Sequence, residues 1–240
     1  MTAKAGAAGG VIAAKRPNEA RPATTKRAKW LVLGSGKGGS GKTTTALNLA
    51  AFAANEGLKV ILVDMDTQET LTRWHSRRPK EAPPLVLHTI PLAKAAEAIE
   101  RIDPEAADTG VDLVIADTPP GIEDHPKESR LLVDRADYVL VPTTQGTPDV
   151  VSVVEWMGFL RREGVRASFL MNRTQRTYSS FREARSTLLK AGPLCPMDVR
   201  QLEDIQSTHK FGVGICEISK AKGAEDIEGV WHHIRHEMGL

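Results

Sequence analysis

Residues 34–45 read GSGKGGSGKTTT, and this stretch decides the fold. It follows the apolar run WLVL at 30–33 and precedes the alanine-rich run ALNLAAFAAN at 46–55. Glycines in such a loop let the backbone curl so that its N–H groups point toward one centre, and a following helix adds the positive end of its dipole there. An apolar strand, this loop and a helix in succession therefore predict a phosphate-binding loop.

Residue types within the loop assign its chemistry. Lys42 stands where a phosphate-binding loop needs its lysine, and it would supply positive charge at the β- and γ-phosphates of a nucleotide. Thr43 offers a hydroxyl to Mg²⁺, and Thr44 can reach the α-phosphate. Lys37 lies inside the glycines, where an ordinary loop of this kind accepts almost any residue. The loop alone leaves open what its second lysine does.

Three aspartates end the apolar runs predicted to lie beside this loop. Asp64 and Asp66 are on alternate residues of an extended chain, so their side chains are expected on one face. Asp117 ends the run at 113–116 and is the candidate for the carboxylate that holds Mg²⁺ through water. A single aspartate could cap a turn, but three at the carboxyl ends of neighbouring strands favour a ligand site.

From Trp30 onward, strand-like and helix-like segments alternate. Continuous apolar runs indicate strands buried on both faces, and their alternation with helices is typical of a mostly parallel sheet. The sequence thus predicts a single α/β domain with a doubly wound sheet flanked by helices. Strands are expected at 30–35, 59–64, 85–89, 111–117, 137–142, 166–172 and 195–199, and helices at 41–57, 68–78, 92–102, 147–164, 179–192 and 224–238.

Charge is unevenly placed along the chain. Residues 1–30 carry seven Lys and Arg against Glu19 alone, a net charge of +6, whereas the remainder carries a net charge of −4. The first 29 residues are also poor in large apolar types, so we expect a disordered basic leader at 1–29 and one domain at 30–240. The leader is either simply solvated or makes an electrostatic contact with DNA or an acidic partner.

Composition and patterning argue against a membrane-spanning protein, a cysteine-based metal or redox site and a terminal helix that binds a membrane. No apolar run reaches the length of about 18 residues that a membrane-spanning helix needs. Cys195 and Cys216 have neither metal-binding nor redox spacing, which favours a reducing, cytoplasmic location. The run at 224–238 has its apolar residues on one helical face and no lysine-rich stripe on the other, so it is expected to pack on the domain rather than on a membrane.

Five segments together resemble the ParA/MinD family of deviant-Walker P-loop ATPases. They are KGGSGKTTT at 37–45, VDMDTQ at 63–68, ADTPP at 116–120, ADYVLVPTTQGTPD at 136–149 and FLMNR at 169–173. The resemblance runs from Lys29 to the C-terminus and is closest to the small ParA-type (ParF-like) partition ATPases, since no folded DNA-binding domain precedes the loop. It implies ATP and Mg²⁺ as ligands and a homodimer when ATP is bound.

The resemblance also implies roles for single residues. Lys37 matches the signature lysine, which reaches across a dimer to the partner's nucleotide; Asp66 matches the aspartate that orients the attacking water; and Asn172 matches the asparagine that reads the adenine edge. Thr67 replaces the family's proline. The expected catalytic residues are Lys37, Lys42 and Asp66; the nucleotide-binding residues are Gly36, Lys37, Gly38, Gly39, Ser40, Gly41, Lys42, Thr43, Thr44 and Asn172; the Mg²⁺ site, partly through water, is Thr43, Asp64 and Asp117.

The resemblance also implies two kinds of binding partner, DNA and an adaptor protein. The resemblance implies weak ATP hydrolysis, stimulated by non-specific nucleoid DNA and by a ParB-like or centromere-binding adaptor, in partition of plasmid or chromosomal DNA. The alternatives are the same mechanism acting on a carboxysome, a chemoreceptor cluster or a conjugation complex, and a static DNA-binding scaffold. Basic residues of the C-terminal third are the candidates for phosphate contacts: Arg182, Arg185, Lys190, Arg200, Lys210, Lys220 and Lys222.

Overall fold

A computed structural model describes residues 27–240, so the predicted leader lies, up to residue 26, outside the described residues. The last three residues of the predicted leader, 27–29, belong with the domain. Strand β1 begins at Lys29, and Arg27 and Lys29 both pair with the Asp137 carboxylate, at 2.7 Å and 3.1 Å. The backbone N–H of Trp30 donates to the same side chain. Asp137 therefore fastens the start of the domain to the start of β5.

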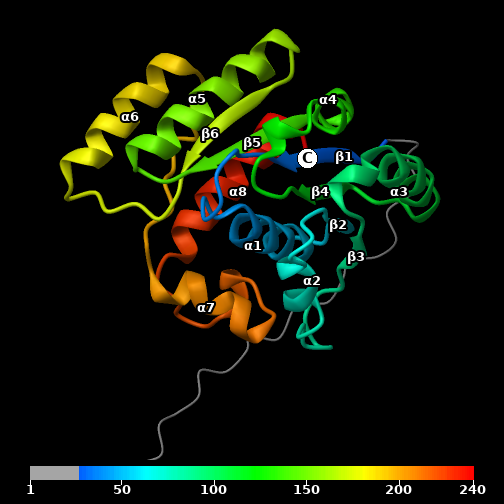
Figure 1. Ribbon diagram of the computed structural model, residues 1–240. Coiled ribbons are helices and arrows are strands. Elements are labelled where there is room, and N and C mark those ends of the chain that lie inside the picture. Colours follow the sequence, from blue (N-terminus) through cyan, green and yellow to red (C-terminus); the bar gives the residue numbers. More distant parts are fainter. Residues whose placement is uncertain (1–26) are drawn as a thin grey trace, which may run out of the picture.

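Six parallel strands form one sheet in the order β3-β2-β4-β1-β5-β6 (Figure 1). Their bounds are β1 Lys29–Leu33, β2 Val60–Asp64, β3 Val86–Thr89, β4 Leu113–Asp117, β5 Tyr138–Thr143 and β6 Ala167–Met171. All residues of β2, β4, β5 and β6 are buried, as continuous apolar runs predict for strands covered on both faces. The predicted α/β fold with a doubly wound sheet is confirmed.

In residues 27–240, eight α-helices cover the two faces of the sheet, and each face has its own hydrophobic core. Trp30 and Val32 of β1 pack on the side of α3, α4, α5 and α6, whereas Leu31 and Leu33 pack on the side of α1, α2, α7 and α8. Figure 1 shows this layering. The helices are α1 Lys42–Asn55, α2 Thr70–His75, α3 Ala95–Thr109, α4 Pro126–Arg135, α5 Thr147–Arg162, α6 Ser179–Ala191, α7 Glu203–Phe211 and α8 Ala224–Met238.

Strand register brings the predicted site residues to one level. Asp117 at the end of β4 pairs with Asp64 of β2 on one side and with Leu33 of β1 on the other. Leu33 is the last residue before the glycine-rich loop. Because parallel strands end at the same edge, the loop and both carboxylates meet there.

Helix α8 packs as its pattern predicts. Its apolar residues are buried against α1 in the second core: Ile227, Val230, Trp231, Ile234 and Met238. Within residues 27–240, no helix is long and apolar enough to cross a membrane. The apolar face of α8 is thus already occupied by the domain itself.

Three segments differ from the sequence-based expectation. The run at 195–199 is not a strand, although the backbone N–H groups of Cys195 and Val199 donate to carbonyl oxygens of β6. Helices α4 and α7 were not predicted, since their apolar residues are too few for a clear period. Helix α3 continues past its expected end and includes Pro104, which is exposed, so water can bond the carbonyl that the proline leaves without a donor.

Arg78 and Glu217 form a buried ion pair that joins the segment after α2 to the short 3-10 helix η3 (Ile215–Glu217). Their side chains are 6% and 4% exposed, and Nη2 of Arg78 lies 2.7 Å from Oε1 of Glu217. Glu217 also accepts from the Gly214 backbone and from Asn55. Removing one partner of such a pair leaves an uncompensated buried charge.

We expect Glu217→Ala to lower the free energy of unfolding by about 3 kcal/mol. The matched control is Glu97→Ala, because Glu97 pairs with Lys94 at a site where both side chains are more than half exposed; it should cost less than about 1 kcal/mol. Urea denaturation of both variants measures the difference. Equal losses in the two variants would show that the Arg78–Glu217 pair does not hold η3 in place.

Candidate nucleotide-binding site

The glycine-rich loop joins the end of β1 to the start of α1 and depends on the absence of a side chain at two positions. Gly41 has φ of 89°, a left-handed conformation that glycine adopts without strain, and a Cβ there would lie 2.3 Å from Nδ2 of Asn172. A Cβ on Gly36 would lie 1.7 Å from Oε1 of Glu123. The loop is therefore enclosed on both sides, by the end of β6 and by η2 (Ile122–Asp124).

Lys42 is buried inside the loop. Its Nζ donates to the carbonyl oxygens of Ser35 and Lys37, each at 3.2 Å. Burial lowers the pKa of Lys42, and the carboxylates of Asp117, Asp66 and Glu123 oppose that shift, in this order. The ammonium group thus stands at the centre of the loop, as its predicted contact with β- and γ-phosphates requires.

Lys37 has the opposite setting. Residues 37–39 are exposed, at the outer turn of the loop, while the Lys37 carbonyl holds Lys42. The two lysines of GKGGSGKT therefore differ in their geometry: one points its charge into its own loop, and the other is carried at the surface.

Asp117 and Thr43 form the donor set that Mg²⁺ prefers. Asp117 is 1% exposed, and neither of its carboxylate oxygens has a hydrogen-bond partner among the atoms of residues 27–240. Burial raises the pKa of Asp117 to about 7, and the nearby Thr43 hydroxyl and Lys42 only partly oppose this. A buried carboxylate with free lone pairs next to a hydroxyl fits a hard cation that binds through oxygen.

Asp64 and Asp66 differ in burial and in what their carboxylates bond, and both act electrostatically on Asp117. Asp64 is fully buried, and its Oδ2 accepts from the backbone N–H and the hydroxyl of Thr72 in α2, both at 2.8 Å. Asp66 lies beyond the end of β2 and is half-buried; its Oδ1 accepts from the Gln68 N–H, which forms a tight turn. Asp64 thus holds the segment that carries Asp66, and Asp66 is the carboxylate left accessible.

Asn172 follows β6 and contacts the loop rather than standing free. Its Nδ2 donates to the Ser40 carbonyl and to the Thr45 hydroxyl, both at 3.2 Å. Beside it is a small hollow lined by Gly41, Thr44, Asn172, Arg173, Arg200, Gln201, Leu202, Ile205 and Gln206. The adenine contact of Asn172 stays a prediction.

Sequence reasoning missed two residues of the site. Glu123 reaches Gly36 from η2, and its Oε1 lies 3.5 Å from Oγ of Ser152. His209 of α7 lies 2.9 Å from the Thr44 hydroxyl. No local pattern marks either residue, because a lone acid in a loop and a lone histidine in a helix are ordinary surface residues, and Thr44 and His209 are far apart in sequence.

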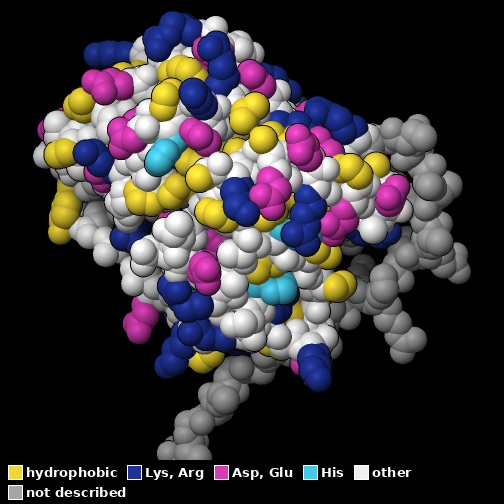
Figure 2. All heavy atoms as spheres, turned by 45° about the vertical axis from the view of Figure 1, so that its right-hand side comes forward, with side chains coloured by type: hydrophobic (Ala, Val, Ile, Leu, Met, Phe, Trp, Pro, Cys, Tyr) yellow, Lys and Arg dark blue, Asp and Glu magenta, His cyan; other side chains and the backbone are white. Residues whose placement is uncertain are grey.

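The DNA-binding candidates divide into two groups. Arg182, Arg185 and Lys190 lie on α6, whereas Lys210, Lys220 and Lys222 lie at the end of α7 and in the turns before α8; Figure 1 shows α6 and α7 well apart. Arg200 differs from both groups because its guanidinium is paired with Asp226, at 2.8 Å, and with Glu225. On the face in Figure 2, basic and acidic side chains are mixed, with no extended patch of one sign.

Comparison with known proteins identifies a matching family and similar relatives. A family model described as the CobQ/CobB/MinD/ParA nucleotide binding domain matches residues 31–239. The maintenance of carboxysome distribution protein A of Gloeobacter kilaueensis is 29% identical over 208 residues, which cover 85% of this chain and 91% of that protein.

Two solved structures share the fold. The cell division ATPase MinD of Pyrococcus furiosus has a TM-score of 0.71 at 17% identity and covers 87% of this chain and 99% of its own. A plasmid partition protein of Borrelia burgdorferi bound to AMPPNP has a TM-score of 0.69 at 18% identity and covers 88% and 100%. With the family model matching nearly all of the described residues, the chain belongs to the CobQ/CobB/MinD/ParA family of nucleotide-binding domains, as its loop and strand-end aspartates indicated.

Proposed function

We propose that the protein is an ATPase that dimerises when it binds ATP, binds DNA without sequence preference and partitions plasmid or chromosomal DNA through an adaptor protein. The observation that carries the proposal is the pair of lysines in one loop, Lys42 buried within it and Lys37 exposed on it. Membership of the family supports ATP as the nucleotide. A Borrelia partition protein of the same fold supports the cargo.

The residues of the site divide the work of phosphoryl transfer, which is mostly positioning and neutralisation of charge. Lys42 and the loop N–H groups hold the β- and γ-phosphates. Thr43 and Asp117 hold Mg²⁺, which when bound draws negative charge from the phosphate oxygens. Asp66, accessible at the end of its turn, orients the attacking water, and Asn172 reads the adenine edge.

Lys37 supplies the remaining positive charge to the partner's nucleotide. It is exposed on the outer turn of the loop, so it can meet a second molecule without any rearrangement of the core. A positive group added from another subunit acts like an arginine finger, whose removal lowers the rate by roughly 10³-fold or more. Hydrolysis would then require the dimer.

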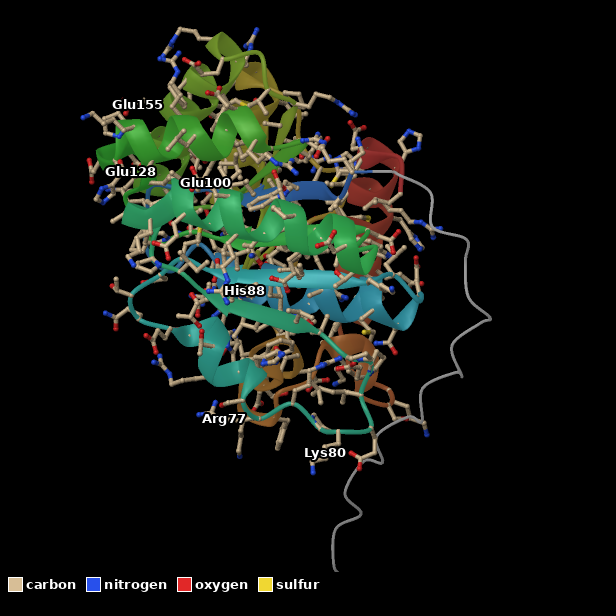
Figure 3. The ribbon with its side chains drawn as sticks, turned by 90° about the vertical axis from the view of Figure 1, so that its right-hand side faces the viewer. Arg77, Lys80, His88, Glu100, Glu128 and Glu155 are labelled. Carbon is tan, nitrogen blue, oxygen red and sulfur yellow. The ribbon has the colours of Figure 1, made fainter. Side chains whose placement is uncertain are left out.

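Lys37→Ala should lower ATP turnover by about 10³-fold, measured as phosphate release, while ATP binding partly survives because Lys42 remains in place. Lys80→Ala is the matched control, since Lys80 is also exposed and lies far from the loop, beyond α2 (Figure 3). A Lys37→Ala protein with wild-type, DNA-stimulated turnover would refute the role of Lys37 in trans.

Asp66→Ala should bind ATP and accumulate as a dimer, because the water is no longer oriented while the phosphate contacts remain. Light scattering with ATP and Mg²⁺ measures the mass, and Asp108→Ala, an exposed aspartate of α3, is the control. If the Asp66→Ala protein binds ATP and stays monomeric, nucleotide binding does not drive dimerisation.

DNA contact is proposed for the two basic groups on α6 and around α7, doubled across the dimer. Alanine in place of Arg182, Arg185 and Lys190, or of Lys210, Lys220 and Lys222, should weaken binding to DNA of any sequence and lower the slope of log K against log salt by about 1 per lost phosphate contact. Fluorescence anisotropy at several salt concentrations measures this. The control replaces three exposed lysines elsewhere, Lys80, Lys94 and Lys127; equal slopes in all three variants would overturn the assignment.

A second candidate has the same ATPase mechanism with a protein cargo. It is favoured by the similarity to the maintenance of carboxysome distribution protein A, which spans most of both chains. Binding partners separate the two: a centromere-like DNA array with a small DNA-binding adaptor supports partition, whereas an adaptor that binds a protein assembly and no such array supports the second candidate.

A further inference from the structure

Helix α7 reaches the nucleotide loop through a single hydrogen bond. Nε2 of His209 lies 2.9 Å from Oγ1 of Thr44, in the first turn of α1. Thr44 is the residue expected at the α-phosphate, and it also lines the hollow beside Asn172. The bond therefore ends at a hydroxyl that faces the place of the nucleotide.

The position of His209 is fixed from a second side. Nη1 of Arg77, just after α2, donates to the His209 carbonyl at 3.2 Å, and Arg77 lies beside α7 in Figure 3. A Cβ on Gly212, which caps α7, would lie 2.4 Å from the Arg77 carbonyl carbon, so the two backbones are in close contact. Helix α7 thus cannot slide without moving the end of α2.

The surroundings of His209 favour the neutral imidazole. Burial lowers its pKa, and the positive charges of Arg173 and Arg77 lower it further. A neutral imidazole carries one N–H, so Nε2 either donates to Thr44 or accepts from it.

A hydroxyl has only one hydrogen, so the two arrangements differ in whether Thr44 can still donate to a phosphate oxygen. If Nε2 accepts, the Thr44 hydrogen is used and none is left for a phosphate oxygen. If Nε2–H donates to Oγ1, the Thr44 hydrogen stays free to be donated to the nucleotide, and the two bonds in series strengthen each other. Without His209, nothing on α7 would fix the direction in which the Thr44 hydroxyl points.

We propose that His209 is a positioning residue for nucleotide binding: its Nε2–H donates to Oγ1 of Thr44 and thereby directs the Thr44 hydrogen to the α-phosphate of the bound nucleotide. The inference rests on the proposed function, since it requires a nucleotide phosphate at Thr44. It assigns to α7, which no motif connects with the loop, a direct influence on affinity.

Affinity for ATP and ADP, measured by calorimetry, tests the pair. His209→Ala should weaken binding of both nucleotides by about 3- to 10-fold, the loss expected for one hydrogen bond. His209→Gln should restore most of it, because its side-chain N–H can reach the place of Nε2–H, whereas the shorter His209→Asn should not. The Michaelis constant for ATP should rise in His209→Ala with little change in kcat.

A double-mutant cycle separates positioning from folding. Thr44→Val keeps the shape of the side chain and removes the hydroxyl, and in this background His209→Ala should cost no further affinity. If His209→Ala costs the same with and without the Thr44 hydroxyl, or if ¹⁵N NMR of the imidazole shows the hydrogen on Nδ1, the proposal is wrong. Should His209→Ala fail to fold, the contrast between His209→Gln and His209→Asn decides the same question.

The wild-type protein distinguishes the two levels of inference. A wild-type protein that binds neither ATP nor ADP contradicts the proposed function. One that binds them, with a His209→Ala variant of unchanged affinity, contradicts only the role of His209.

Discussion

The burial of Lys42 and Asp117 at the same edge of the sheet is the constraint on which the site depends. Moving a single charge out of water costs several kcal/mol, and each of these groups is held in the interior by contacts that are incomplete. Lys42 bonds only to carbonyl oxygens of its own loop, and Asp117 has two buried oxygens without a partner among the described residues. The fold stabilises a site whose charges are balanced better when a ligand is bound.

The parallel sheet makes this arrangement possible because it ends three strands at one level. Asp64 connects the sheet to the segments that follow it: it is buried in β2, yet its carboxylate holds Thr72 of α2 and the backbone of Asp66. Arg77, just after α2, donates a hydrogen bond to the His209 carbonyl, and the His209 side chain is hydrogen-bonded to Thr44. The segment that carries Asp66 and the first turn of α1, which carries Thr44, are thus connected to each other through α2 and α7.

Sequence reasoning succeeded where the signal is local. The loop, the buried strands with their terminal aspartates and the apolar face of α8 are each specified by neighbouring residues, so the fold class could be named in advance. It failed where the partner is distant: the bond of Asp64 to Thr72 was not foreseen, the run at 195–199 bonds to β6 without forming a strand, and His209 and Glu123 reach the loop from elements that carry no motif. Arg200 is similar, since its pairing with Asp226 cannot be inferred from spacing.

The charge of the site bears on the role proposed for the second lysine. Asp117, Asp66 and Glu123 all act on Lys42, so three carboxylates surround one ammonium group before any phosphate arrives. A triphosphate adds further negative charge, which a divalent cation at Asp117 and Thr43 offsets only in part. The proposed function adds positive charge to the phosphates from outside this set. Lys37 is the loop residue that carries such a charge at the surface, where it can be presented to the loop of another molecule.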